Sequence, residues 1–173
     1  MTPPDDPTVP AVTWRWLGFD ELTPVDLYAL MKLRQEVFVV EQNCVYLDAD
    51  GLDPSCIHGM ATATDDAALV AHARLVPAGL AYATPSIGRV VTAPRARGWG
   101  LGRTLMTKAL AESESRFPAK VITIGAQLYL QRFYESFGFA AVGRPYEEDG
   151  IMHIEMTRPS GLAVIDRGRR RST

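Results

Sequence analysis

The chain contains the stretch Pro94-Arg95-Ala96-Arg97-Gly98-Trp99-Gly100-Leu101-Gly102-Arg103-Thr104-Leu105-Met106-Thr107-Lys108. An apolar segment, Ile87–Thr92, precedes it, and an amphipathic helical pattern follows, with Leu101, Leu105, Ala109 and Leu110 on one face. Glycine has no Cβ, so a ligand can approach the alternating glycines closely. The N–H groups of the first helical turn then face that ligand. This pattern predicts a strand, loop and helix that cradle a pyrophosphate; a glycine-rich turn without a ligand is the alternative.

The glycine spacing excludes two common nucleotide-binding loops. A dinucleotide fingerprint, G-x-G-x-x-G, would need a third glycine where Arg103 stands. A P-loop needs four residues between its glycines and then Lys, whereas Gly98 and Gly102 are separated by three residues and Arg103 follows.

The spacing that fits is Arg-x-x-Gly-x-Gly, at Arg97, Gly100 and Gly102. It resembles motif A of the GCN5-related N-acetyltransferases, which in that family binds the pyrophosphate of acetyl-CoA. The segment Phe133–Phe139 resembles the late motif of the same family, F-Y-x-x-x-G-F. Two further segments, Leu33–Cys44 and Tyr146–Ile154, resemble the ElaA-like branch. The resemblance covers about Trp14 to Met156 and implies acetyl-CoA as co-substrate, with no metal.

The resemblance also implies roles for individual residues. A β-bulge in the strand before the loop would free the main chain of Val90–Thr92 to bind the pantetheine arm. The N–H of Thr92 would polarise the thioester carbonyl. Tyr134 would protonate the departing thiolate; a structural tyrosine is the alternative. The implied cofactor-binding residues are Val90, Val91, Thr92, Arg97, Gly98, Trp99, Gly100, Leu101, Gly102 and Arg103.

The acceptor side is less determined. We expect Arg34, Glu41 and Gln42 to line the acceptor pocket, with a surface ion pair between Arg34 and Glu41 as the alternative. Many relatives place a glutamate on the strand where this chain has Gly88 and Arg89. A water chain and several side chains therefore stay open as the general base: Glu41, Asp48, Asp50, Asp53, His58, His72 and His153.

The pattern along the chain predicts an α/β fold with a central mixed sheet, flanked by helices and splayed at the cofactor cleft. We expect strands at Val12–Leu17, His58–Thr64, Ala68–Val76, Ile87–Thr92, Val121–Gly125, Ala140–Gly143 and Ile151–Thr157. We expect helices at Leu22–Leu33, Leu101–Phe117 and Leu128–Phe137, and a buried apolar turn at Val37–Val40. In the first helix the apolar residues near helical spacing are Leu22, Val25, Leu30 and Leu33, with Thr23 as the N-cap and Pro24 at N1. In the third helix the spacing places Phe133 and Phe137 on one face. Strands Ile87–Thr92 and Val121–Gly125 flank a crossover helix and should be parallel neighbours.

The length of 173 residues predicts one domain, which we expect at 12–158, after a disordered segment (1–11) and before a basic, flexible tail (159–173). With 47% hydrophobic and 22% charged residues, the chain is near globular averages. A net charge of −2 gives no general attraction to nucleic acid. Cys44 and Cys56 lack metal-type spacing. Neither a membrane span nor a signal peptide is visible, so we expect a cytoplasmic protein without membrane contact. A homodimer stays open.

The sequence leaves three functional interpretations open. The first is an acetyl-CoA-dependent N-acetyltransferase acting on a small-molecule or peptidyl amine. The second is an acyl-homoserine-lactone-type synthase, which Arg34-x-x-Val37-Phe38 faintly resembles. The third is a non-catalytic CoA-sensing module. Tyr134 favours the first interpretation over the third.

Overall fold

The computed structural model describes residues 10–119 and 121–161. These residues form two structural units. The first unit holds residues up to 74 together with 89–109, and the second holds 75–88 together with the residues from 110 onward. Nearly all of the predicted disordered segment (1–11) and most of the predicted basic tail (159–173) lie outside the described residues.

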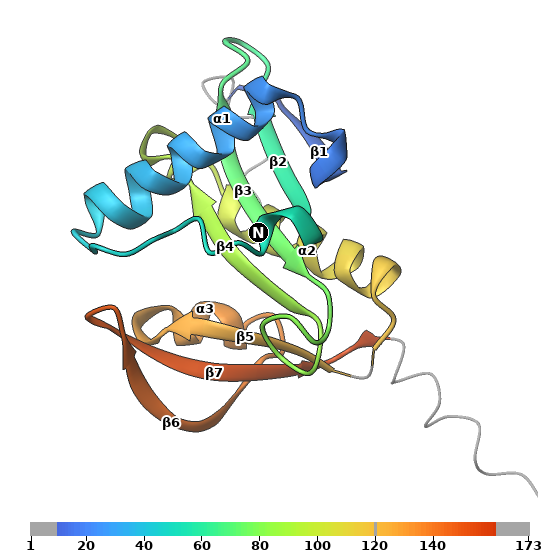
Figure 1. The fold of residues 1–173 in the computed structure, drawn as a ribbon, viewed down its shortest axis with the longest axis vertical. Helices are drawn as coiled ribbons and strands as arrows, with labels where there is room; N and C mark the ends of the chain where they lie inside the picture. Colours follow the sequence, from blue (N-terminus) through green and yellow to red (C-terminus); the bar gives the residue numbers. More distant parts are fainter. Residues whose placement is uncertain (1–9, 120, 162–173) are drawn as a thin grey trace, which may run out of the picture. The chain divides into compact units, whose positions relative to one another are not determined.

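The strands belong to a seven-stranded mixed sheet of order β1-β2-β3-β4-β5-β7-β6 (Figure 1). β4 and β5 are parallel and pair at Ser86 and Thr123, which confirms the predicted parallel neighbours. The pairs β1–β2, β5–β7 and β6–β7 are antiparallel. The predicted α/β class with a mixed sheet is therefore confirmed. The strands are β1 (Val12–Gly18), β2 (Ile57–Ala63), β3 (Leu69–Val76), β4 (Ser86–Thr92), β5 (Val121–Gln127), β6 (Ala140–Glu148) and β7 (Ile151–Pro159).

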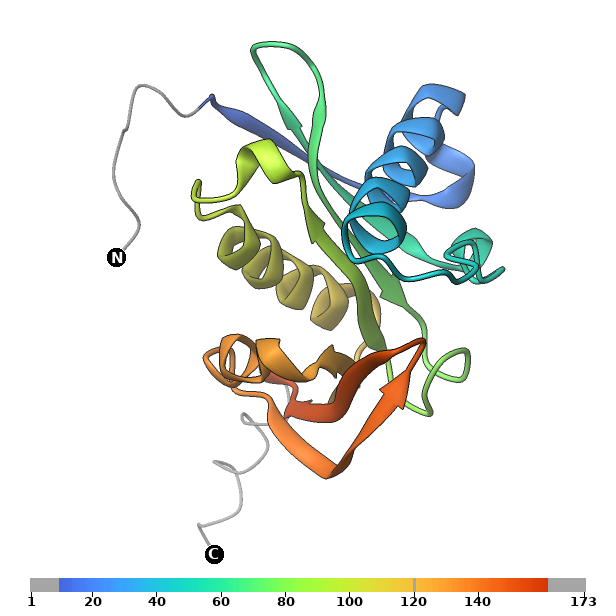
Figure 2. The ribbon, with the colours of Figure 1, turned by 90° about the vertical axis from the view of Figure 1, so that its left-hand side faces the viewer.

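In the first unit, α1 (Pro24–Arg34) lies beside β2 and β3 (Figure 2). Thr23 caps it by accepting a hydrogen bond from the N–H of Asp26, and Pro24 stands at N1, as predicted. Leu30 and Leu33 are buried against the unit, whereas Val25 is 77% exposed. The apolar spacing of α1 thus predicted the helix correctly but assigned Val25 to the wrong face.

The predicted buried turn at Val37–Val40 is wrong. The chain continues from α1 directly into a π-helix, Gln35–Glu41. Val37 is buried, but Val40 is 74% exposed. Consecutive residues of any helical turn point in different directions, so a run of adjacent apolar residues cannot all face the core.

The helix α2 (Leu101–Arg116) begins at the glycine-rich loop. Its predicted apolar face is confirmed, because Leu101, Leu105, Ala109 and Leu110 are each at most 7% exposed.

In the second unit, the predicted helix Leu128–Phe137 is a 3₁₀ turn (Leu128–Leu130) followed by the short helix α3 (Gln131–Glu135). Gly138 has a φ of +86°, the left-handed conformation expected of the residue that ends a helix. β6 is longer than predicted, and its pairing with β7 shifts register between Val142 and Tyr146. α3 and β5 are in contact, and buried residues such as Ile122 and Ile124 form this unit's core.

Candidate functional site

The glycine-rich loop has the geometry of a backbone cradle. Gly98 and Gly100 have φ values of +89° and +74°, which L-residues with a side chain rarely adopt. A Cβ built on either glycine would meet no described atom within 4 Å. The N–H groups of Arg103 and Thr104 donate to the carbonyl of Gly100, so α2 starts inside the loop. The first helical N–H groups therefore belong to the predicted anion-binding segment.

Arg97, predicted to bind the cofactor, contacts Glu41, predicted to line the acceptor pocket. One guanidinium nitrogen of Arg97 donates to both carboxylate oxygens of Glu41 at 2.8 Å. The two side chains are 46% and 41% exposed, so this ion pair is accessible to solvent. Gln42 lies at the end of the π-helix, where its backbone N–H donates to the carbonyl of Val37. The first unit thus brings Glu41 and Arg97 together.

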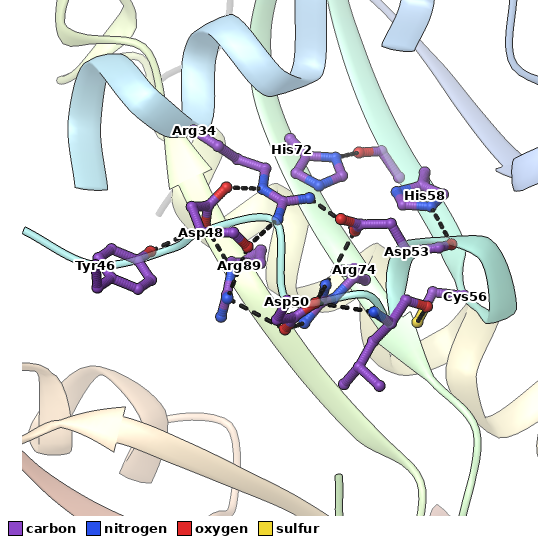
Figure 3. Close-up of polar contacts among 12 residues, drawn as sticks. Arg34, Tyr46, Asp48, Asp50, Asp53, Cys56, His58, His72, Arg74 and Arg89 are labelled. Atoms are coloured by element: carbon purple, nitrogen blue, oxygen red, sulfur yellow. Dashed lines mark hydrogen bonds and ion pairs between the residues drawn. The ribbon is translucent and has the colours of Figure 1, made fainter. Parts of the chain in front are cut away.

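Arg34 is fully buried, at 0% exposure. Its Nε donates to Asp48 Oδ2 and its Nη1 to Asp53 Oδ1, both at 2.7 Å, and its Nη2 donates to the carbonyl of Asp48 at 2.9 Å (Figure 3). The alternative of a surface pair between Arg34 and Glu41 is wrong, because each has another partner. The burial also gives Arg34 no surface for the predicted direct contact with an acceptor. Its guanidinium instead fixes the segment from Asp48 to Asp53.

The contacts of Arg34 belong to a larger cluster, called here the ion-pair network, that sequence reasoning did not find. Arg74 on β3 binds Asp50 and Asp53, with Nη2 2.5 Å from Asp50 Oδ2 and Nη1 3.0 Å from Asp53 Oδ1. Arg89 on β4 pairs with Asp48 and Asp50 (Figure 3). The network consists of Arg34, Asp48, Asp50, Asp53, Arg74 and Arg89. Its three positive and three negative side chains balance.

The network makes its aspartates poor candidates for the general base. Burial raises the pKa of Asp50, but hydrogen bonds from Arg74 and from the N–H of Leu52 outweigh burial and lower it to about 2. Burial likewise raises the pKa of Asp53, and hydrogen bonds from Arg34 and Arg74 reverse this to a net lowering. A carboxylate with a lowered pKa gives up protons readily and takes them poorly. The carboxylate of Asp48 pairs with Arg34 and Arg89 and accepts a hydrogen bond from the hydroxyl of Tyr46.

Two of the candidate histidines are core residues. His58 and His72 are both 0% exposed, and their rings stack with centroids 5.6 Å apart. His58 Nε2 lies 3.0 Å from the carbonyl of Asp53, and His72 Nδ1 lies 2.9 Å from the carbonyl of Gly59. A carbonyl accepts, so each of these nitrogens carries a proton. Burial lowers the pKa of both rings, that of His72 to about 3.

The third candidate histidine, His153, lies in the second unit and is partly exposed. Its ring stacks on Tyr146 at 6.0 Å, and its Nδ1 lies 2.9 Å from the carbonyl of Ile151. Within the predicted base set, Glu41 and Asp50 are exposed and His153 is partly exposed. The general base stays unassigned.

Strand β4 is irregular next to its predicted cofactor-binding segment. Arg89 has a φ of +50° within the strand. The resemblance implies a bulge that turns the backbone of Val90–Thr92 toward the cofactor, and a left-handed residue directly before this segment fits that expectation. Val91 is buried, whereas Val90 and Thr92 are partly exposed.

Tyr134 lies on α3 in the second unit and is 8% exposed. Its ring meets Phe133 and Phe139 edge-on, with centroids 5.1 and 6.1 Å apart. Phe133 and Phe137 also pack on each other at 5.1 Å, as the helical spacing predicted. Burial, with a smaller contribution from Tyr129, raises the pKa of Tyr134 to about 12. Its hydroxyl therefore keeps its proton at neutral pH, as a proton donor must.

Within residues 10–119 and 121–161, no group of three or more His, Cys, Asp or Glu side chains could hold a metal ion. In the same part of the chain, no helix is both long and apolar enough to span a membrane.

Comparison with known proteins gives consistent matches. The model of the acetyltransferase (GNAT) domain matches residues 52–159. A UPF0039 protein of Synechocystis sp. is 43% identical over 145 residues, which are 84% of this chain and 94% of that protein. The crystal structure of Escherichia coli ElaA is 43% identical with a TM-score of 0.79, over 86% of this chain and 99% of that one. An acyl-CoA N-acyltransferase from Pseudomonas aeruginosa is 42% identical with a TM-score of 0.80, over 86% and 99%. The resemblance stated from the sequence is thereby confirmed.

Proposed function

Because the chain belongs to the GNAT acetyltransferase family, we propose that it transfers an acetyl group from acetyl-CoA to a primary amine of a small-molecule or peptidyl acceptor in the cytoplasm. The observation that carries the proposal is the loop at Gly98 and Gly100. Both glycines are left-handed with open space at the Cβ position, directly before the N-terminus of a 16-residue helix. Such a loop binds phosphate through main-chain N–H groups and the helix dipole.

The family resemblance supports a donor for each of the two charges that develop in the proposed acetyl transfer. Bound acetyl-CoA supplies the thioester carbonyl and a thiolate leaving group. As the amine attacks, the N–H of Thr92 stabilises the carbonyl oxygen that becomes negative, a contribution of roughly 3 kcal/mol for a preorganised donor. Tyr134 gives its hydroxyl proton to the departing sulfur. The attacking nitrogen loses its proton to a base or to water.

The direct test is a panel of amines with acetyl-CoA, read by thiol release. Turnover of at least one amine is the expected result, and longer acyl donors in the same assay separate acetyl transfer from acyl-homoserine-lactone-type synthesis. Thiol release that never exceeds the amine-free rate, together with no acetyl-CoA binding in calorimetry, contradicts the proposal.

We expect Gly100→Val to weaken acetyl-CoA binding at least tenfold, or about 1.4 kcal/mol. The branched side chain would occupy the space proposed for the phosphates, and the φ of +74° is strained for valine. Calorimetry on the folded variant measures this. Gly150→Val is the matched control, since Gly150 has a φ of +80°, similar open space, and a position in the β6–β7 turn. Equal affinities of the two variants would remove the loop assignment.

We expect Glu41→Gln to raise the acceptor KM about fivefold while changing acetyl-CoA affinity less than threefold. Removing one charge of the acceptor site weakens uniform binding, which appears in KM. The exposed pair with Arg97 contributes little, because solvent-exposed ion pairs are typically worth about 0–1 kcal/mol. Steady-state kinetics in both substrates measures the two effects. An unchanged acceptor KM would leave Glu41 with its ion pair alone.

A further inference from the structure

Arg89 has a conformation that its own backbone does not favour. Its φ of +50° lies in the left-handed region, although it stands within strand β4. A Cβ makes this region costly, and an arginine side chain gives no local compensation. Such residues persist where the surrounding structure holds them.

The Arg89 side chain is held from several directions (Figure 3). Its Nε lies 2.7 Å from Asp48 Oδ1. Its Nη2 donates to the carbonyl of Asp48 at 3.1 Å and to Asp50 Oδ2 at 3.2 Å. The guanidinium carbon lies 5.7 Å from the centroid of the Tyr46 ring. The side chain is 22% exposed, so most of it is enclosed, whereas its contact with Asp50 faces solvent.

The groups that hold Arg89 are themselves fixed. Asp48 accepts from Arg34 on α1 and from the hydroxyl of Tyr46, and Asp50 accepts from Arg74 on β3. Arg34 and Arg74 are 0% and 4% exposed. The ion-pair network is thus a rigid anchor built from α1 and β3, and it reaches β4 through Arg89.

We propose that Arg89 is a positioning residue. The ion-pair network holds the left-handed turn at Arg89 and thereby sets the direction of the backbone from Val90 to Thr92. This inference rests on the proposed function, in which that backbone binds acetyl-CoA and Thr92 donates to the thioester. When the contacts between Arg89 and the ion-pair network are lost, residue 89 relaxes to an extended conformation. The backbone conformation that binds acetyl-CoA then becomes a minor state, and the apparent affinity falls in proportion to the population of that state.

The test compares Arg89→Ala with Arg89→Gly. Both variants lose every side-chain contact with the ion-pair network, but glycine adopts positive φ about as readily as negative φ. For Arg89→Ala we expect acetyl-CoA affinity to fall about 5- to 30-fold, the equivalent of the left-handed cost of roughly 1–2 kcal/mol. For Arg89→Gly we expect a loss of about threefold or less. Calorimetry gives the affinities, and thermal unfolding verifies that both variants fold.

Two further variants distinguish the loss of a network contact from the loss of a positive charge near the loop. Arg95→Ala removes the same charge close to the loop, from an exposed pair with Asp66 that lies outside the network, and should leave affinity within about twofold. Asp50→Asn weakens the contact between residue 50 and Arg89 while Arg89 itself is kept. It should lower acetyl-CoA affinity, as Arg89→Ala does.

Equal affinities of Arg89→Ala and Arg89→Gly would overturn the inference. Crystal structures of the two ligand-free variants test it without acetyl-CoA: a φ that stays positive in Arg89→Ala also overturns it, and a negative φ supports it. Failure of the proposed function looks different, because the unaltered protein would then neither bind acetyl-CoA nor release thiol.

Discussion

We expect Tyr134→Phe to lower kcat roughly 100-fold and to leave acetyl-CoA affinity nearly unchanged. The loss is that of general-acid catalysis on the departing thiolate. The hydroxyl acts mainly as charge develops on sulfur, so ground-state binding does not depend on it. Phenylalanine keeps the edge contacts of the ring with Phe133 and Phe139, and the packing of α3 therefore persists.

Steady-state kinetics and calorimetry measure the two effects. Tyr129→Phe is a matched control from the same unit, because Tyr129 is 72% exposed. Since the pKa of Tyr134 is about 12, its hydroxyl also stays protonated across the assay range, and kcat should show no alkaline decline up to about pH 10. A Tyr134→Phe variant that keeps near-normal kcat in a chemistry-limited assay would show that the thiolate leaves without this donor.

The second large effect concerns stability. We expect Arg34→Leu to lower the free energy of unfolding by about 3–5 kcal/mol, because it leaves the buried carboxylates of Asp48 and Asp53 without their shared partner. This is a large part of the roughly 5–15 kcal/mol that stabilises a typical domain. Leucine fills much of the volume of the Arg34 side chain, so the loss of unfolding free energy is due to uncompensated charge more than to a cavity.

Urea denaturation followed by circular dichroism measures the change. Arg15→Leu is the matched control, since Arg15 also pairs with an aspartate, Asp26, but is 44% exposed. It should cost less than about 1 kcal/mol, as surface ion pairs do. If the two variants unfold at the same urea concentration, the network does not contribute as a buried unit.

The sequence predicted well those parts of the molecule that local spacing determines. The alternating glycines and the apolar face at Leu101, Leu105 and Ala109 predicted the loop and α2, because glycine positions and helical periodicity are local signals. The same holds for Thr23 and Pro24 at the start of α1. The family resemblance was read from short local motifs, and the comparisons confirm the family.

The ion-pair network could not be predicted in the same way. Its partners are far apart in sequence: Arg34 and Asp48 are 14 residues apart, and Arg89 and Asp48 are 41 apart. A sequence shows that charges are present but not which carboxylate meets which guanidinium. Arg34 therefore looked like an accessible residue of the acceptor side. The spacing Asp48-x-Asp50-x-x-Asp53, with arginines in two later strands, was the available signal.

The edge strand β6 bears on how the protein behaves at high concentration. β6 ends the sheet order, and all nine of its residues are exposed. An exposed edge offers unpaired backbone groups to a neighbouring molecule, which invites aggregation through intermolecular β-pairing. In β6, the register shift after Val142 interrupts the ladder, Pro145 lacks an N–H, and Glu147 and Glu148 add charge. The strand is therefore a poor template for a further chain, which protects this end of the sheet from fibril-like assembly.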